Sequence, residues 1–404
     1  MHGSSRASTA AGTEQARYEL ADIVRAHGEA YRRSYTVSAA QARALRAIAR
    51  CRTAALGGHV EACDACGARQ VAYNSCRNRN CPKCQAGARA KWLAAQQAAL
   101  LPVEYFHIVF TLPHALNALV RVNPRQLYAL LFRVAAATLQ SFARDPRHLG
   151  AELGVTAVLH TWGQNLAQHP HLHCVVTGGG LTLDGQRWIS ARAGFLFPVR
   201  ALSKVFRGKF LAALVQLRAR NALRFVGNSA PLAGDHCWIS WLQDLRTRDW
   251  VVYAKPPFGG PERVLKYLSR YTHRVAIANH RLVSIEDGIV RFRWRDYAHH
   301  SEVKVMALPA TEFLRRFLLH VVPSGFMRIR HFGLLANRNR AAKLARCRSL
   351  LAPTPEVEVN RCDSAELSGE ASDSAADEPK RCPICGAGPL RIIEFLAPLR
   401  GVPP

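Results

Sequence analysis

The sequence is poor in acidic residues. It contains 28 Asp and Glu against 55 Lys and Arg, which gives a formal net charge of +27 over 404 residues. Eight of the acids fall in one short segment, 356–378, so the rest of the chain is more basic still. Lys and Arg in such excess bind polyanions, because neutralising phosphates releases their condensed counterions. The composition therefore predicts a nucleic-acid partner rather than compositional bias alone.

Long apolar runs are also absent. The first 15 residues lack the apolar core of a signal peptide, and no segment approaches the roughly 18 apolar residues that a membrane-spanning helix needs. We therefore expect a soluble protein in a reducing compartment, with no membrane partner. Disulfides are rare in such compartments, so the twelve cysteines are expected to bind metal instead.

The chain is long enough for two or three domains, and its composition changes along its length. We predict a disordered polar segment (1–17), a helical zinc-binding module that docks DNA (18–103), a body of helices and strands with a basic helical tail (104–350), an acidic flexible linker (351–380) and a C-terminal Cys-x2-Cys fragment (381–404). Apolar periodicity predicts strands at 104–112, 155–160 and 171–176, helices at 114–143, 195–217 and 261–274, one or two strands within 238–253, a hairpin of 275–286 and 288–295, and helix over 312–350.

Two Cys-x2-Cys pairs predict a structural zinc site. Cys63 and Cys66 are separated from Cys81 and Cys84 by fourteen residues, a spacing that can bring four thiolates to the corners of a tetrahedron. His59 and Cys76 lie in the same block and are alternative ligands or packing residues. Four filled positions leave no room for a reactive water, so the module is expected to dock nucleic acid rather than catalyse.

A third pair, Cys382 and Cys385, is half of a zinc site. Cys347 or Cys362 could complete it, as could a second subunit, and an unmetallated pair is equally compatible with the sequence.

Three histidines alternate in the segment 168–176, QHPHLHCVV. Residues i and i+2 of a strand project to one face, so His171 and His173 project together while Leu172 and Cys174 pack on the other side. Two imidazoles on one face predict a metal site, and hydrogen bonding to neighbours is the alternative. His169 shares the face by parity, but Pro170 breaks the regularity of the strand, so we do not assign it as a ligand.

The predicted helix 261–274 starts with proline, which suits a first helical turn. Tyr267 and Tyr271 are four residues apart and lie on one face. Four cations line one flank of the pair and are assigned to DNA binding: Arg263, Lys266, Arg270 and Arg274. Two half-buried core tyrosines are the alternative. Beside a metal ion and these cations, however, a phenolate could attack a phosphodiester, so both tyrosines are candidate nucleophiles.

These motifs resemble those of the HUH endonucleases. The chain is most similar to the two-tyrosine rolling-circle transposases of bacterial insertion sequences, the insertion-sequence ninety-one family, over roughly residues 20–350. The motifs that carry the resemblance are YFHIVFTL at 105–112, HLH at 171–173, Tyr267-x3-Tyr271, CRNRNCPKC at 76–84, TWGQNL at 161–166, RYTHRVAI at 270–277, FRWRDYAH at 292–299 and GFMRIRHFGLLANR at 325–338.

The resemblance implies an α+β fold, with an HUH nuclease core in which helices flank a central antiparallel sheet. It also implies a transposase that nicks and rejoins single-stranded DNA in the bacterial cytoplasm, at the nucleoid. His171 and His173 would bind Mg²⁺ or Mn²⁺, and Tyr267 or Tyr271 would form a 5′-phosphotyrosine and leave a free 3′-hydroxyl. Gln164 is our choice for the third metal ligand, and His273 and His107 are alternatives.

Three other functions are compatible with parts of the sequence. A replication initiator or relaxase would use the same chemistry, but the zinc block, the basic tail and the lack of a helicase segment argue against it. A non-catalytic zinc-containing DNA-binding regulator could keep an inert nuclease fold. A metal-dependent hydrolase of small substrates would need more acidic ligands and would leave the charge of +27 unexplained.

Overall fold

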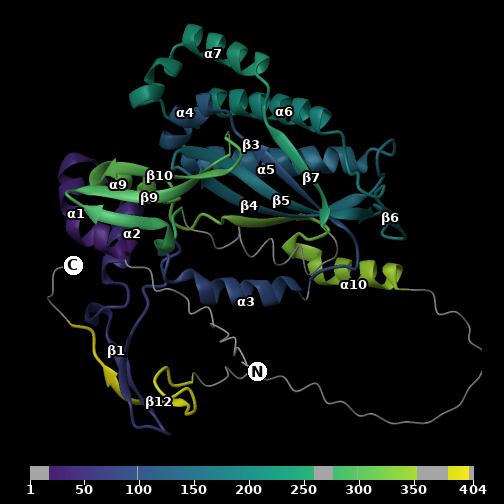
Figure 1. Cartoon of the computed structure of the whole chain (residues 1–404). Helices are drawn as coiled ribbons and strands as arrows, with labels where there is room; N and C mark the ends of the chain where they lie inside the picture. Colours follow the sequence, from purple (N-terminus) through teal and green to yellow (C-terminus); the bar gives the residue numbers. More distant parts are fainter. Residues whose placement is uncertain (1–17, 98, 259–275, 298, 353–380, 400–404) are drawn as a thin grey trace, which may run out of the picture.

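The computed structural model describes residues 18–97, 99–258, 276–297, 299–352 and 381–399 (Figure 1). Its centre is an antiparallel sheet of six strands in the order β11-β4-β5-β3-β7, with β6 paired to β5. The strands are β3 (Tyr105–Thr111), β4 (Glu152–Trp162), β5 (Gln168–Leu181), β6 (Trp188–Ser190), β7 (Val252–Phe258) and β11 (Ile329–Gly333). Since β5 lies in the middle, the histidine segment runs through the centre of the sheet.

One face of the sheet is covered by helices. They are α4 (Asn117–Val122), α5 (Pro124–Arg144), α6 (Val199–Ala219) and α7 (Asp235–Thr247), the group above the sheet in Figure 1. Pro124 occupies the first turn of α5, where a missing N–H leaves no hydrogen bond unmade. Leu172 and Cys174 of β5 pack into this core, and Phe110 of β3 meets Phe206 of α6 with ring centroids 4.9 Å apart. The prediction that Leu172 and Cys174 pack on the apolar face of β5 is thus confirmed.

The opposite face carries the histidines and is partly covered by α3 (Gln85–Gln97) and α10 (Arg340–Leu351), below the sheet in Figure 1. Val175 of β5 and Tyr105 of β3 pack there against Trp92 and Leu100. This apolar cover lies on the Val175 side of the histidines along β5.

A second core unites the beginning of the chain with residues between 276 and 321. It is built by α1 (Leu20–Ser34), α2 (Ala39–Arg50), α9 (Ala310–Leu318) and a sheet of β8 (Leu282–Glu286), β9 (Ile289–Asp296) and β10 (Glu302–Pro309). Ser38 separates α1 from α2, because its Oγ accepts a hydrogen bond from the Gln41 N–H while its own N–H donates to Gln41 Oε1. Phe292 of β9 packs on Phe313 of α9 with ring centroids 5.6 Å apart.

A third, small sheet projects beside these cores. β1 (Gly58–Cys63) pairs with β2 (Arg69–Tyr73) on one edge and with β12 (Leu390–Leu396) on the other, and both pairings are antiparallel. The C-terminal fragment therefore adds a strand to a hairpin near the start of the chain, as the yellow strand beside β1 shows in Figure 1. Among the described residues, no helix combines the length and apolarity needed to cross a membrane.

The α+β class, with a central antiparallel sheet flanked by helices, is confirmed. Two local predictions are only partly right. One or two strands were predicted within 238–253, but only the start of β7 falls there, and α7 occupies most of the range, because Trp238, Leu242 and Leu245 are buried at helical spacing. The predicted continuous helix 312–350 contains β11, which hydrogen-bonds to β4 along the edge of the sheet.

Candidate metal centres and nuclease site

Four cysteines gather at the end of α2 and form what we term the inner cluster: Cys51, Cys76, Cys81 and Cys84. Their sulfurs all lie within 4.8 Å of one another. The Sγ of Cys84 is 3.4 Å from that of Cys51 and 3.6 Å from that of Cys76. A tetrahedral ion with Zn–S bonds of about 2.3 Å sets its sulfurs about 3.8 Å apart, so the inner cluster fits zinc.

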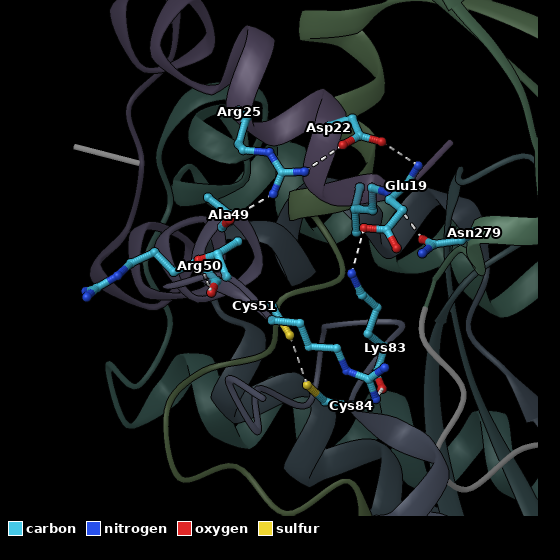
Figure 2. A network of polar contacts seen from close by, with 12 residues as sticks. Glu19, Asp22, Arg25, Ala49, Arg50, Cys51, Lys83, Cys84 and Asn279 are labelled. Atoms are coloured by element: carbon cyan, nitrogen blue, oxygen red, sulfur yellow. Dashed lines mark hydrogen bonds and ion pairs between the residues drawn. The ribbon is translucent and has the colours of Figure 1, made fainter. Parts of the chain in front are cut away.

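The inner cluster is fixed to the first helix by charge pairs. Lys83, which lies between two of its cysteines, pairs through Nζ with Glu19 Oε2 at 2.8 Å, and Glu19 is the N-cap of α1 (Figure 2). Arg25 of α1 donates to the Ala49 carbonyl of α2 at 3.0 Å and to Asp22 Oδ1 at 2.6 Å. Lys83 thus ties the cysteine loop to the start of α1, and Arg25 ties α1 to the end of α2.

A second set of four cysteines, the outer cluster, lies at the tip of the small sheet: Cys63, Cys66, Cys382 and Cys385. Its sulfurs also lie within 4.8 Å of one another. Cys63 Sγ is 3.6 Å from Cys385 Sγ, and Cys66 Sγ is 3.7 Å from Cys382 Sγ. These separations are again those of a tetrahedral thiolate site.

The single zinc site predicted from Cys63, Cys66, Cys81 and Cys84 is therefore wrong as a grouping. The hairpin of β1 and β2 carries the first pair to its tip, whereas the second pair returns with Cys76 to the end of α2. His59 belongs to neither cluster, and its Nε2 lies 3.1 Å from Glu61 Oε1. Cys347 does not complete the C-terminal pair, because it is buried between α10 and the central sheet; Cys362 lies outside the described residues.

Three histidines form a separate group on the central sheet: His160, His171 and His173. Their candidate ligand nitrogens lie within 4.8 Å of one another. His171 and His173 share one face of β5, and His160 of β4 lies directly opposite His171 in the antiparallel register. The structure thus brings together the two histidines predicted from the sequence and adds a third.

Hydrogen bonds orient the two rings on β5. His171 Nδ1 lies 2.7 Å from the His169 carbonyl, so this nitrogen carries the proton and Nε2 is left with its lone pair. His171 Nε2 is 3.1 Å from His173 Nε2, while His173 Nδ1 is 2.9 Å from His107 Nε2 on β3. His173 can therefore direct Nε2 to an ion only as the tautomer that donates from Nδ1 to His107. Partners of this kind orient metal-binding imidazoles.

Packing orients the ring of His160, and burial keeps the rings of His171 and His107 neutral. The ring of His160 stacks on Trp162 with centroids 4.7 Å apart and an interplanar angle of 18°. Burial lowers the pKa of His171 to about 4 and that of His107 to about 3, with the charges of Lys255 and His171 as further causes at His107. Both rings are therefore neutral at pH 7. His171 keeps a lone pair for an ion, and His107 keeps one to accept a hydrogen bond from His173.

Gln164 and His169 point to other partners. Gln164 follows the end of β4, and its side-chain amide donates to Tyr297 Oη at 3.3 Å. The ring of His169 lies 5.1 Å from that of His171 between centroids, but its Nδ1 is 3.2 Å from His114 Nε2, so this nitrogen already has a partner outside the group.

Known proteins resemble this chain over almost its whole length. A family model described as "Putative transposase" matches residues 154–343, and one described as "Transposase zinc-binding domain" matches residues 23–112. A Sinorhizobium fredii protein, "Putative transposase y4qJ", is 52% identical over 386 residues, which are 95% of this chain and 97% of that protein. The chain belongs to the IS91 family of transposases. A Pseudomonas savastanoi pv. phaseolicola protein, "Transposase for insertion sequence element IS801", is 29% identical over 351 residues, which are 83% of this chain and 80% of that protein. No solved structure matches.

Both cysteine clusters contain residues of the segment that matches the transposase zinc-binding domain. The match over 23–112 contains all four residues of the inner cluster but only Cys63 and Cys66 of the outer one. Together with the thiol geometry, this match supports structural zinc in the transposase. The predicted nucleophiles Tyr267 and Tyr271 lie outside the described residues, as do Arg263, Lys266, Arg270, Arg274 and His273.

Two residues of these groups were missed from the sequence, Cys51 and His160. Cys51 stands alone after α2, with no second cysteine at short spacing to mark it as a ligand. For His160 a signal exists, because it and His171 lie on strands joined by a short turn. Only the register of that hairpin, which is irregular between His160 and Trp162, shows that the two side chains meet.

A buried histidine makes the stability of the transposase depend on pH. His320 is 4% exposed; its Nε2 lies 3.1 Å from the Leu166 carbonyl and its Nδ1 3.2 Å from Thr161 Oγ1, and burial lowers its pKa to about 4. The unfolded chain takes up this proton below about pH 6.5, whereas the folded chain resists it down to about pH 4. Stability should therefore be complete above pH 6.5 and fall as the pH drops toward 4, by on the order of 3 kcal/mol for this group.

The measurement is urea unfolding at pH 7.5 and pH 4.5. His320→Gln should be less stable at pH 7.5 but lose less stability on acidification than the parent chain. Equal losses in the two proteins would contradict the assignment.

Proposed function

We propose that this transposase nicks and rejoins single-stranded DNA through a covalent bond between a tyrosine and a 5′-phosphate. The observation that carries the proposal is the convergence of His160, His171 and His173 from two neighbouring strands, with ligand nitrogens within 4.8 Å of one another. A structural role for the three rings would not require this convergence, because the two nitrogens of a buried imidazole can be satisfied by other groups, as those of His320 are by Thr161 and the Leu166 carbonyl.

We assign His160, in place of Gln164, as the third ligand of a catalytic divalent ion. A Mg²⁺ or Mn²⁺ ion bound there would polarise the scissile phosphodiester and stabilise the charge that develops on it. Imidazole suits Mn²⁺ better than Mg²⁺, and in either case water and phosphate oxygens would fill the other positions. His107 would hold His173 in the required tautomer, and Trp162 would fix the ring plane of His160.

Tyr267 or Tyr271 would supply the nucleophile. Its phenolate oxygen bonds to phosphorus, the 3′-oxygen of the preceding nucleotide leaves and is protonated to a hydroxyl, and the 5′ end stays on the protein. The second tyrosine would allow two cut ends to be held at once, as strand rejoining requires. Arg263, Lys266, Arg270 and Arg274 of the same segment would neutralise phosphates of the bound strand. Sequence spacing and family membership support this assignment.

The test is to trap and map the covalent adduct. The full chain is incubated with labelled single-stranded DNA that carries insertion-sequence ends, with Mn²⁺ or Mg²⁺, and the adduct is trimmed with nuclease and digested with trypsin. Trypsin cuts after Lys266, Arg270 and Arg274, so the two tyrosines fall on separate peptides, YLSR and YTHR. The nucleotide mass should appear on one or both peptides and require the divalent ion.

Tyr297 provides an internal control, because it is 67% exposed and hydrogen-bonds to Gln164 near the end of β4. An adduct on Tyr297 would overturn the nucleophile assignment. Absence of any adduct across a library of single-stranded sequences would favour the non-catalytic regulator. Cleavage of double-stranded DNA without an adduct would overturn the proposed chemistry.

A further inference from the structure

We propose that the outer cluster binds a zinc ion of its own, and that this ion fastens the C-terminal segment 381–399 to the N-terminal hairpin. Two of its ligands, Cys382 and Cys385, lie far beyond the zinc-binding domain match, which ends at residue 112. The transposase would then carry two structural zinc ions, one held within the N-terminal module and one shared between distant parts of the chain.

The two halves of the outer cluster have the same local structure. In each, the N–H two residues after the first cysteine approaches its sulfur: Ala65 N is 3.4 Å from Cys63 Sγ, and Ile384 N is 3.4 Å from Cys382 Sγ. A glycine follows the second cysteine of each pair, Gly67 with φ +68° and Gly386 with φ +71°. Each glycine N–H donates to the carbonyl of the first cysteine, at 3.0 and 2.9 Å. N–H groups directed at sulfur stabilise thiolates, which is the form that zinc binds.

The two halves also fit closely against each other. A Cβ on Gly388 would lie 2.6 Å from Cys63 Sγ, so only glycine allows this approach. The Asp64 N–H donates to the Pro389 carbonyl at 3.3 Å, and Arg391 Nε pairs with Asp64 Oδ2 at 2.6 Å. The four sulfurs therefore converge through matched turns that each half builds for itself.

Apolar burial does not explain how the C-terminal strand is held. Residues 391–395 of β12 are all exposed, and Phe395 is 81% and Ile392 51% exposed. What remains is the backbone pairing with β1 and the solvent-exposed ion pair of Arg391 with Asp64, and such hydrogen bonds and surface ion pairs each contribute little net stability. That gain must offset the entropy lost when the long segment between α10 and β12 is closed into a loop. Zinc bound by four thiolates supplies the missing stabilisation, because the free energy of binding structural zinc becomes folding free energy in small metal-binding domains.

The first experiment counts metal in the full chain. Elemental analysis of the reduced, dialysed protein should give two zinc ions per chain, and Cys382→Ser with Cys385→Ser should give one. Cys237→Ser, at an exposed cysteine outside both clusters, is the matched control and should keep two. One zinc in the parent chain, two in the double variant, iron in place of zinc, or a disulfide within the outer cluster would each overturn the proposal.

The second experiment tests the fastening. A recognition sequence for a specific protease is placed within 356–378, the full chain is cleaved there, and the products are separated by size exclusion. The C-terminal peptide should stay with the body in zinc-containing buffer. It should leave after chelation, and leave at once in the Cys382→Ser, Cys385→Ser variant. Retention of the peptide by the metal-free double variant would show that strand pairing suffices and would overturn the fastening role.

Discussion

Replacing His160 or His173 with alanine is expected to lower the rate of single-strand cleavage in Mn²⁺ by at least about 100-fold, since even partners of metal ligands cost 10- to 100-fold when removed. Each change takes away one of three nitrogens that lie within 4.8 Å of one another. The loss should accompany weaker Mn²⁺ binding, measured by calorimetry on the full chain without DNA. Zinc content should not change, because the histidines and the two cysteine clusters are separate groups.

Two neighbours serve as controls for the histidine variants. His169→Ala removes a ring of the same strand that pairs with His114, and Gln164→Ala removes the amide that donates to Tyr297. Both variants should keep cleavage within about threefold of the parent rate, as expected when no ligand is lost. If His160→Ala kept full activity and Gln164→Ala lost it, the third ligand would be Gln164 and not His160.

The second large effect is expected at the inner cluster. Cys81 is 1% exposed and packs in the second core, so Cys81→Ser removes a zinc ligand and places a hydroxyl among apolar side chains. Loss of the ion forfeits part of a binding free energy that reaches roughly 10 kcal/mol or more in zinc-dependent domains. A net loss of about 4 kcal/mol would lower the melting temperature by roughly 5 °C for a chain of this length. Calorimetric melting and zinc analysis of the same sample measure both effects.

Two cysteine variants separate zinc loss from packing. Cys174→Ser makes the same chemical change in the first core, at a cysteine that is 1% exposed and outside both clusters, and should keep two zinc ions. Cys66→Ser removes a ligand of the outer cluster at an exposed position and should lower the zinc count with a much smaller change in melting temperature. A Cys81→Ser protein that keeps both ions would show that the inner cluster is not a zinc site.

The sheet and its histidine pair could be predicted because their signals are local. The alternation of His171, Leu172, His173 and Cys174 assigns each side chain to a face of the strand, and the structure confirms that Leu172 and Cys174 lie in the core. Local signals fail where a segment's residues are compatible with both helix and strand. The residues of α7 include Trp238, Ile239 and Trp241, which favour strand, and only the burial of Trp238, Leu242 and Leu245 reveals the helix.

The grouping of ligands could not be predicted, because it depends on pairings between distant segments. Spacing within 63–84 suggested one site, yet the strand pairing of β1 with β12 brings Cys382 and Cys385 to Cys63. In the same way, the partner of His171 across the hairpin depends on the irregular register at the end of β4. The tyrosine segment remains a prediction from its spacing.

The pairing of β1 with β12 also sets an order of events during synthesis. The hairpin 58–73 leaves the ribosome early with two of the four sulfurs of the outer cluster, whereas Cys382 and Cys385 emerge only after all strands of the central sheet. The strands of the central sheet are complete once Gly333 has been made, and chains fold from the N-terminus as they emerge. A polypeptide that stopped between Gly333 and Cys382 would contain every strand of the central sheet but only two strands of the small sheet. Pairing of β12 with β1 would thus distinguish chains that extend through Leu396 from shorter ones.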